Sequence, residues 1–157
     1  MLDDVSPRPA PPRLAVRAVL LSEDRLLLVN AWRGRTRLWC APGGGVEVHS
    51  SLPENLVREV REETGLSIRV GPPCLVNEFH DPGGTIHQVE VFFRCRLLAG
   101  ALSEEWRDPE GVVTHRRWVT RSSAERMVGE DALRPTALPA VAFGRGIAYD
   151  ALEPILR

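Results

Sequence analysis

One helix with a clear beginning and a clear end constrains this chain most. Ser51, followed three positions later by Glu54, is a capping-box pattern that satisfies the first free backbone N–H groups of a helix. Gly65 suits the left-handed conformation that often ends one. Between these signals the apolar residues recur at helical spacing, at Leu56, Val57 and Val60. The pattern therefore predicts a helix over residues 52–64.

Short apolar runs bounded by polar turns lie on both sides of this helix and predict β-strands. Residues 81–84, with the sequence Asp-Pro-Gly-Gly, form a strong turn signal, so the runs beside them are expected to make a hairpin. The prolines at 72–73 separate two runs, and the three glycines at 43–45 are expected to exclude regular structure. The expected strands are 14–21, 26–29, 38–41, 68–70, 75–79, 86–98 and 117–119.

The other segments complete an α/β pattern. Residues 32–37 and 103–114 are polar and predict loops, and a second helix is expected to begin at Ser122 with a serine cap. The tail, residues 133–157, is expected to be helical in part, although prolines interrupt it. Strands dominate around one sharply defined helix, which favours an α/β fold with helices covering a mixed sheet.

Size and charge limit the classes of function. The 157 residues suit one domain, which we expect over 13–157, after a flexible proline-rich N-terminus at 1–12. A net charge of −1 argues against general nucleic-acid or membrane binding. Three well-separated cysteines predict free thiols, with neither a zinc site nor a disulfide framework. No signal segment and no apolar run of about 20 residues is evident, so we expect no membrane span and a cytoplasmic protein.

Three glutamates on the predicted helix carry the chemical signal. Glu59, Glu62 and Glu63 are related by steps of three and four residues, so they share one face and repel one another. They also lie in the last turns, where the helix dipole disfavours carboxylates. Arg58 and Arg61 are one source of compensating charge, which would make this a solvated, salt-bridged surface. A hard divalent cation such as Mg²⁺, which prefers carboxylate oxygens, is the other.

The same residues resemble the Nudix box, usually written Gly-x5-Glu-x7-Arg-Glu-U-x-Glu-Glu-x-Gly-U, where U is a bulky aliphatic residue. The chain matches with every gap preserved, from Gly44 to Leu66, and departs at one position, where Ser50 stands in place of the first glutamate. Glu47 and Glu54 are candidates to replace that carboxylate. The matching residues are Gly44, Arg58, Glu59, Val60, Glu62, Glu63, Gly65 and Leu66. The resemblance implies a Nudix-like α/β/α sandwich with the catalytic helix at about 52–64.

The resemblance also implies a set of site residues. Mg²⁺ or Mn²⁺ would be held by the carbonyl of Gly43 together with Glu59, Glu62 and Glu63, and Arg58 would orient the carboxylates. A further carboxylate is expected from a later loop, where Glu110 is favoured over Glu104 and Glu105. The residues expected to contact substrate are Gly44, Arg33 and Arg37. Trp32, His80 and His87 are candidate pocket residues, and Glu90 is predicted in a strand without a preferred face.

The implied function is a metal-dependent hydrolase that cleaves the diphosphate linkage of a nucleoside diphosphate joined to another moiety. The alternative is a catalytically weak Nudix-like module that binds a nucleotide metabolite without cleaving it, which the departure at Ser50 makes conceivable. The expected partner is a small-molecule nucleotide, and assembly as a homodimer is left open. The sequence does not identify which nucleotide is bound.

Overall fold

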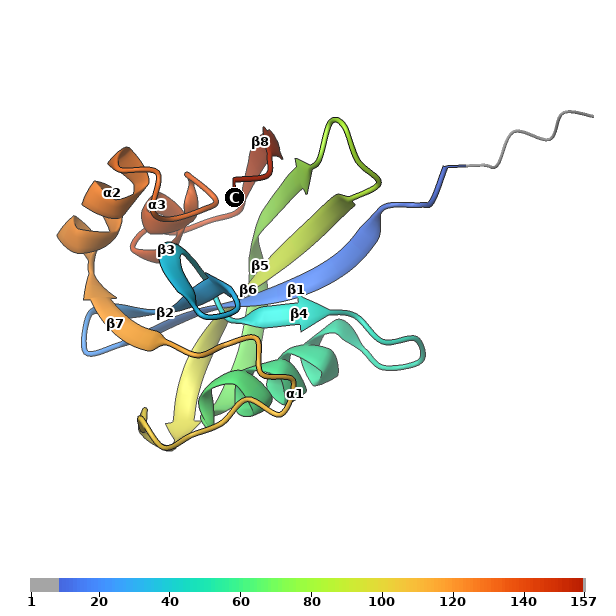
Figure 1. Cartoon of the computed structure of the whole chain (residues 1–157). Coiled ribbons are helices and arrows are strands. Elements are labelled where there is room, and N and C mark those ends of the chain that lie inside the picture. Colours follow the sequence, from blue (N-terminus) through green and yellow to red (C-terminus); the bar gives the residue numbers. More distant parts are fainter. Residues whose placement is uncertain (1–8, 157) are drawn as a thin grey trace, which may run out of the picture.

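A computed structural model describes residues 9–156 of the chain (Figure 1). The strands in this range are β1 (Arg13–Ser22), β2 (Arg25–Trp32), β3 (Arg35–Cys40), β4 (Gly43–Gly45), β5 (Ser67–His80), β6 (His87–Ala99), β7 (Arg116–Thr120) and β8 (Ala148–Pro154). The helices are α1 (Leu52–Thr64), α2 (Arg121–Gly129) and α3 (Leu138–Ala142). None of the helices in the described part of the chain is long and apolar enough to cross a membrane.

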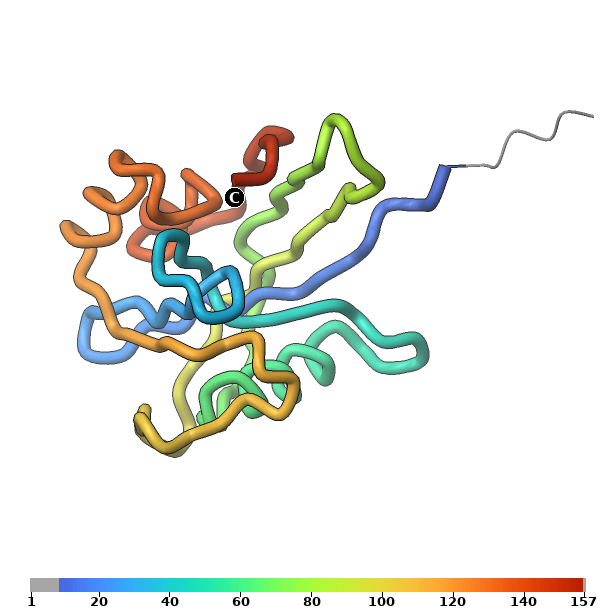
Figure 2. Tube along the Cα trace, viewed as in Figure 1, coloured from blue at the N-terminus to red at the C-terminus, as the bar shows by residue number. Residues whose placement is uncertain are grey.

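The strands form one mixed sheet whose main path runs β3-β2-β1-β6-β5-β8. Strand β4 pairs with β1 and strand β7 pairs with β2, beside that path. The β1–β6 and β5–β8 pairs are parallel, and the remaining pairs are antiparallel. The β5–β6 hairpin is the longest ladder and crosses the middle of the molecule, as the Cα trace shows (Figure 2).

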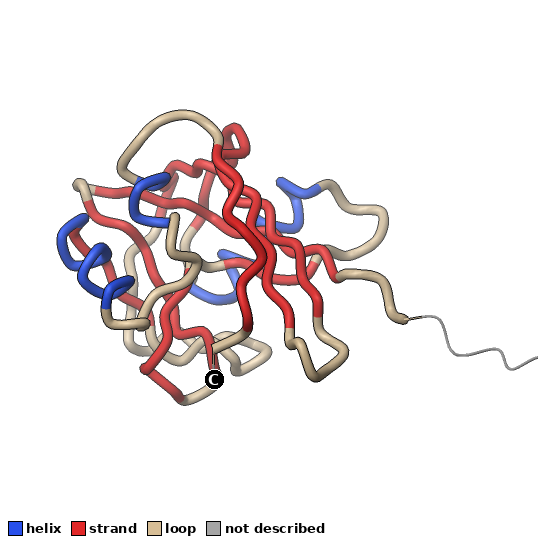
Figure 3. The backbone as a smooth tube through the Cα atoms, turned by 90° about the horizontal axis from the view of Figure 1, so that it is seen from above, coloured by secondary structure: helices blue, strands red, loops and turns tan. Residues whose placement is uncertain are grey.

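Helices cover both sides of the sheet, which gives the α/β/α layering that we expected (Figures 1 and 3). Alternation along β1 explains the two cores, because successive side chains of a strand point to opposite faces. Val16, Ala18 and Leu20 pack in one core with Leu56 and Val60 of α1. The second core lies beneath α2 and α3 and contains Val19, Leu26, Leu28, Phe92, Met127, Leu133, Leu138 and Val141.

Helix α1 has the predicted bounds, and both of its ends are satisfied as the sequence indicated. The Ser51 side chain accepts a hydrogen bond from the backbone N–H of Glu54, whose carboxylate accepts one from the backbone N–H of Ser51. Gly65 takes the left-handed conformation, with φ of 76°, and ends the helix. Leu56 and Val60 are buried and pack on the sheet as predicted, whereas Val57, which we had placed with them, is exposed.

Two expectations about glycine and proline were wrong. Residues Gly43–Gly45 form strand β4, because their backbone pairs with Ala15, Val16 and Arg17 of β1 even though glycine disfavours regular structure. The prolines at 72–73 do not divide β5, because the ladder with β6 absorbs them through register shifts between Val70 and Leu75.

Several boundaries also differ from the prediction. The expected loop at 32–37 is only a tight turn, since β3 already begins at Arg35 and pairs with Trp32. Thr120, and not Ser122, caps α2 by accepting a hydrogen bond from the backbone N–H of Ser123. The tail contains the expected helix α3. It also contains strand β8, which we did not predict because its sequence has no alternation of apolar and polar residues. The predicted flexible segment 1–12 lies mostly outside the described residues.

Candidate active site

A cavity of about 350 Å³ opens where β1, β4, β5 and β6 meet the end of α1. Its other walls come from β2 and β3, from the loop that contains Asp108 and Glu110, from residues 134–135 and from the C-terminal residues 153–156. Among its described lining residues, three are arginines and six are acidic. These charged residues are Arg13, Arg17, Arg134, Glu59, Glu63, Glu90, Asp108, Glu110 and Glu153.

Two glutamates of α1 reach this cavity because the strand in front of them consists of glycine. A Cβ atom added to Gly44 would lie 2.6 Å from the Glu59 carboxylate. A Cβ atom on Gly43, where φ is 152°, would lie 1.9 Å from the carbonyl oxygen of Val16. The backbone N–H of Gly43 donates to Glu63 Oε1 at 3.2 Å. The glycines thus let carboxylates of α1 cross strand β4, a role that the sequence did not reveal.

Burial perturbs the protonation of both carboxylates. Glu63 is 6% exposed, and burial raises its pKa to about 8, although Arg17 and the N–H of Gly43 oppose this shift. The neighbouring carboxylates of Glu59 and Asp108 raise it further. Burial also raises the pKa of Glu59, which is 8% exposed, against the opposing charge of Arg58. The site therefore concentrates negative charge in a place where water stabilises it poorly.

Arg58 joins three carboxylates beside the cavity. Its guanidinium lies 3.2 Å from Glu59 Oε1, 3.4 Å from Glu62 Oε2 and 3.4 Å from Glu47 Oε1. Neither Arg58 nor Glu62 lines the cavity, and the Glu62 side chain is 29% exposed. Ser50 is exposed just before the helix, and Glu54 is engaged in the helix cap. Of the two candidates to replace the missing box glutamate, Glu47 is therefore the one in contact with Arg58.

Arg17 and Glu90 form an ion pair on the cavity floor that sequence reasoning missed. Burial alone would lower the pKa of Arg17, but the charges of Glu90 and Glu63 raise it, so this arginine stays charged. Arg17 also donates to the carbonyl oxygens of Ala41 at 3.2 Å and Gly43 at 3.3 Å. A charged residue inside the apolar run 14–21 was the available signal, and Glu90 lies on the cavity face.

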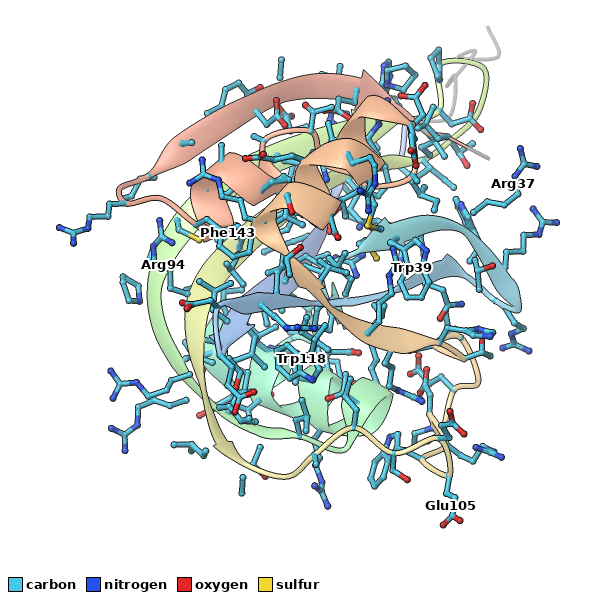
Figure 4. The ribbon with its side chains drawn as sticks, turned by 90° about the vertical axis from the view of Figure 1, so that its left-hand side faces the viewer. Arg37, Trp39, Arg94, Glu105, Trp118 and Phe143 are labelled. Carbon is cyan, nitrogen blue, oxygen red and sulfur yellow. The ribbon has the colours of Figure 1, made fainter. Side chains whose placement is uncertain are left out.

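The loop after β6 brings one predicted carboxylate to the cavity and leaves two outside. Glu110 lines the cavity, whereas Glu104 and Glu105 do not, and Figure 4 shows Glu105 extending from the outer bend of this loop. Asp108, which we had not considered, also lines it and accepts hydrogen bonds from the backbone N–H groups of Glu110, Val112 and Val113.

The two arginines expected to touch substrate do not line the cavity. Arg33 donates to the carbonyl oxygen of Glu110 at 2.8 Å, so it supports the loop. Arg37 extends from β3 into solvent (Figure 4). Of the other candidate pocket residues, Trp32 lines the cavity, whereas His80 and His87 do not. Arg13 is a further lining residue that we had not predicted.

The donor set fits a hard divalent cation that retains water. Among residues 9–156, no three His, Cys, Asp or Glu side chains converge closely enough to enclose an ion. Glu59 and Glu63 nevertheless provide two buried carboxylates, and Gly43, whose N–H donates to Glu63, lines the same cavity. Mg²⁺ is usually bound through one or two carboxylates, its own waters and substrate phosphates, so a complete protein cage is not required.

Comparison with known families agrees with this geometry. The model of the NUDIX domain matches residues 11–138, which include the glycine strand, the glutamate helix and both parallel partners β1 and β6. The chain belongs to the NUDIX family. The resemblance that we read from the spacing of the box residues is thus confirmed.

Curated relatives include several named phosphohydrolases. The chain is 30% identical over 92 residues to a putative ADP-ribose pyrophosphatase of Bacillus subtilis, covering 57% of this chain and 43% of that protein. It is 34% identical over 96 residues to diphosphoinositol polyphosphate phosphohydrolase 3-alpha of Mus musculus, covering 61% and 55%. The chain thus spans about half the length of these relatives.

Solved structures share the fold of this NUDIX protein. An ADP-ribose pyrophosphatase from Streptococcus suis superposes with a TM-score of 0.64 at 22% identity, covering 91% of this chain and all of that one. A NUDIX hydrolase from Nitrosomonas europaea gives a TM-score of 0.67 at 18% identity, covering 93% and 81%. The α/β fold is confirmed by these structures.

Proposed function

We propose that this NUDIX protein is a divalent-metal-dependent pyrophosphohydrolase. Its substrate would be a nucleoside diphosphate joined to another moiety. The observation that carries the proposal is the pair of buried carboxylates, Glu59 and Glu63, that face the cavity across a strand of glycine. Two carboxylates with raised pKa values favour a cation at this position.

Each residue would act in a defined way. Glu59 and Glu63, with the carbonyl of Gly43, would hold Mg²⁺ or Mn²⁺. Glu62, which is outside the cavity lining, would contribute through Arg58, with which it is paired. The ion supplies positive charge against the diphosphate and makes water more acidic. Arg58 would fix the Glu59 and Glu62 carboxylates through its planar fork. Glu110 is close enough to Glu59 to raise its pKa, which supports a role for its carboxylate at the same ion.

The charges in the cavity favour a nucleotide over a diphosphoinositol polyphosphate, although the relatives include enzymes named for both. A polyphosphorylated ring needs many free cationic groups. Here Arg17 is paired with Glu90, and Arg134 with Glu153 and Asp131, among twice as many acidic as basic lining residues. Apolar side chains such as Phe79 and Ile86 suit a flat base better than a ring of phosphates.

The binding-only alternative has less support. It was motivated by Ser50, but Glu47 lies 3.4 Å from Arg58 and offers a carboxylate in contact with the box. The named relatives are pyrophosphatases and phosphohydrolases, and none of those quoted above is named as a binding module. We therefore infer a catalytic site in which Glu47 partly replaces the missing glutamate.

The test is a substrate panel with and without metal. ADP-ribose, a UDP-sugar, a dinucleoside polyphosphate and a diphosphoinositol polyphosphate would be incubated with Mg²⁺. For the nucleotides, phosphate would be measured after alkaline phosphatase treatment, which attacks the monophosphate products. We expect turnover of a nucleotide that EDTA abolishes and that Glu59→Gln and Glu63→Gln each reduce by about a hundredfold or more. Glu105→Gln, in the exposed loop, is the matched control. Undiminished turnover in EDTA would refute the metal assignment, and no turnover on any member would refute the hydrolase.

A further inference from the structure

The cavity contains one buried acceptor without a partner, the side-chain oxygen of Asn77. This residue lies on β5, lines the cavity and is 2% exposed. Its Nδ2 donates to the carbonyl oxygen of Glu78 at 3.3 Å, whereas its Oδ1 has no hydrogen-bond partner within the described part of the chain. A buried acceptor left unsatisfied is costly, and native proteins contain few of them. Either a trapped water or a ligand in the cavity satisfies it.

The neighbours of Asn77 define the chemistry of this part of the cavity. In the β5–β6 ladder Asn77 faces Glu90, and Phe79 faces Gln88. All four line the cavity, because alternate residues of a strand share a face. The Glu90 carboxylate is engaged by Arg17. The Oδ1 of Asn77 is thus the acceptor that stays free, with the buried amide of Gln88 and the ring of Phe79 in the adjacent row.

The surrounding wall combines apolar side chains with the Arg134–Glu153 ion pair, and the C-terminal residues hold it in place. The indole N–H of Trp32 donates to the carbonyl oxygen of Leu156 at 3.2 Å. The backbone N–H of Ile155 donates to the carbonyl oxygen of His80 at 2.9 Å. Residues 153–156 line the cavity together with Trp32. A flat aromatic group that carries a hydrogen-bond donor matches this combination of an apolar wall and one free acceptor.

We propose that Asn77 is a specificity-determining residue whose Oδ1 accepts a hydrogen bond from the exocyclic amino group of the substrate's nucleobase, as in adenine. The inference rests on the proposed function and names the class of nucleotide: bases with an amino group are preferred over bases with an oxo group at the same position. The bond from Nδ2 to the backbone carbonyl of Glu78 fixes the orientation of the amide in the cavity lining. An oxo base would place its carbonyl against that oxygen, and a site built for a donor rejects a ligand that lacks it.

Binding of nucleoside monophosphates tests the proposal without requiring catalysis. AMP and IMP differ in the group at issue, since amino is replaced by oxo, and would be titrated calorimetrically against the wild-type protein with Mg²⁺. We expect AMP to bind roughly tenfold more tightly than IMP. Asn77→Leu, which keeps a similar volume, should abolish the preference. Glu78→Gln is the matched control, because its side chain lies on the other face of β5, with His87 and Tyr149, and it should leave the preference unchanged.

The thermal stability of Asn77→Leu distinguishes a role of Asn77 in ligand recognition from a role in holding the fold together. Removal of an unsatisfied buried acceptor should leave the thermal midpoint of Asn77→Leu equal to or above that of the wild type, whereas loss of a structural hydrogen bond would lower it. The proposal is overturned if the wild type binds neither nucleotide, if it does not distinguish them, or if Asn77→Leu retains the preference. The last result would mean that a trapped water, and not the ligand, satisfies Oδ1 in the wild type. A protein that prefers AMP but hydrolyses no member of the panel would refute the proposed function and leave the role of Asn77 standing.

Discussion

Glu63 gives the sharpest prediction, because its proton links folding to pH. Its pKa is about 8 in the folded chain and 4.5 when the side chain is free in water. Between these values the folded state holds a proton that the unfolded state has released. The free energy of unfolding therefore falls as pH rises through this window, by about 1.4 kcal/mol per pH unit for one proton. From about pH 5.5 to about pH 7 the loss amounts to roughly 2 kcal/mol.

Glu63→Gln should remove this dependence. Glutamine keeps an oxygen that can accept the hydrogen bond from the N–H of Gly43. The assay is urea unfolding of the metal-free protein at the two pH values, analysed at constant m-value. We expect the wild type to lose roughly 2 kcal/mol more than the variant, so that the variant is the more stable protein near pH 7. The exposed Glu105→Gln variant should behave like the wild type.

The same unfolding measurement in the presence of Mg²⁺ tests the proposed metal site. Mg²⁺ should stabilise the wild type near pH 7, by about 2.7 kcal/mol at a concentration one hundred times the Kd, because the ion binds only the folded carboxylates. It should stabilise Glu63→Gln far less. If the two proteins lost the same stability between the two pH values, Glu63 would not hold the buried proton and the electrostatic reasoning would fail.

Three further predictions test the rest of the site. Gly44→Ala should lower turnover by roughly a hundredfold, because the new methyl group displaces the Glu59 carboxylate. The far-UV circular dichroism spectrum should stay unchanged, and unchanged turnover would refute the role of the glycine. Glu90→Gln should lower the free energy of unfolding by about 3 kcal/mol, because it leaves a charged and mostly buried Arg17 without this partner. Urea unfolding measures the change, and a loss below about 1 kcal/mol would contradict the prediction. Ser50→Glu should raise turnover or tighten Mg²⁺ binding. Stability should not fall, since the helix dipole favours a carboxylate at this position by about 0.3–1 kcal/mol. A variant that improved neither turnover nor Mg²⁺ binding would favour the binding-only alternative.

The sequence predicted local structure well where the signal was local. The caps of α1 depend on Ser51, Glu54 and Gly65, which lie within one turn of its ends, and both bounds were predicted correctly. Strand β8 was missed for the opposite reason. It is an edge strand whose side chains are mostly exposed, so its pairing with β5 depends on long-range contacts and leaves no apolar alternation to read.

The residues of the candidate site show the same difference between local and long-range signals. The box residues Glu59 and Glu63 were identified because one helix places them together, whereas Arg17 and Glu90 meet only because β1 and β6 pair in parallel. No spacing in the sequence encodes that pairing. A charged residue within an apolar strand is nevertheless a usable signal, since burial of a charge demands a partner of opposite sign on a neighbouring element. Applied to residues 14–21, this rule would have directed the search to acidic residues in the other strands.

The glycine strand β4 combines a local sequence signal with a long-range strand pairing. Three glycines looked like a break in structure, because an isolated strand of glycine is unstable. Their lack of side chains is what allows Glu59 to lie over Gly44 while the backbone still pairs with β1. The helix thereby places two carboxylates in a cavity whose other walls include β5, β6 and the C-terminal residues. Since the box provides the carboxylates of the proposed metal site and other strands provide Asn77, Phe79 and Ile86, the proposed nucleotide preference should depend on residues outside the box.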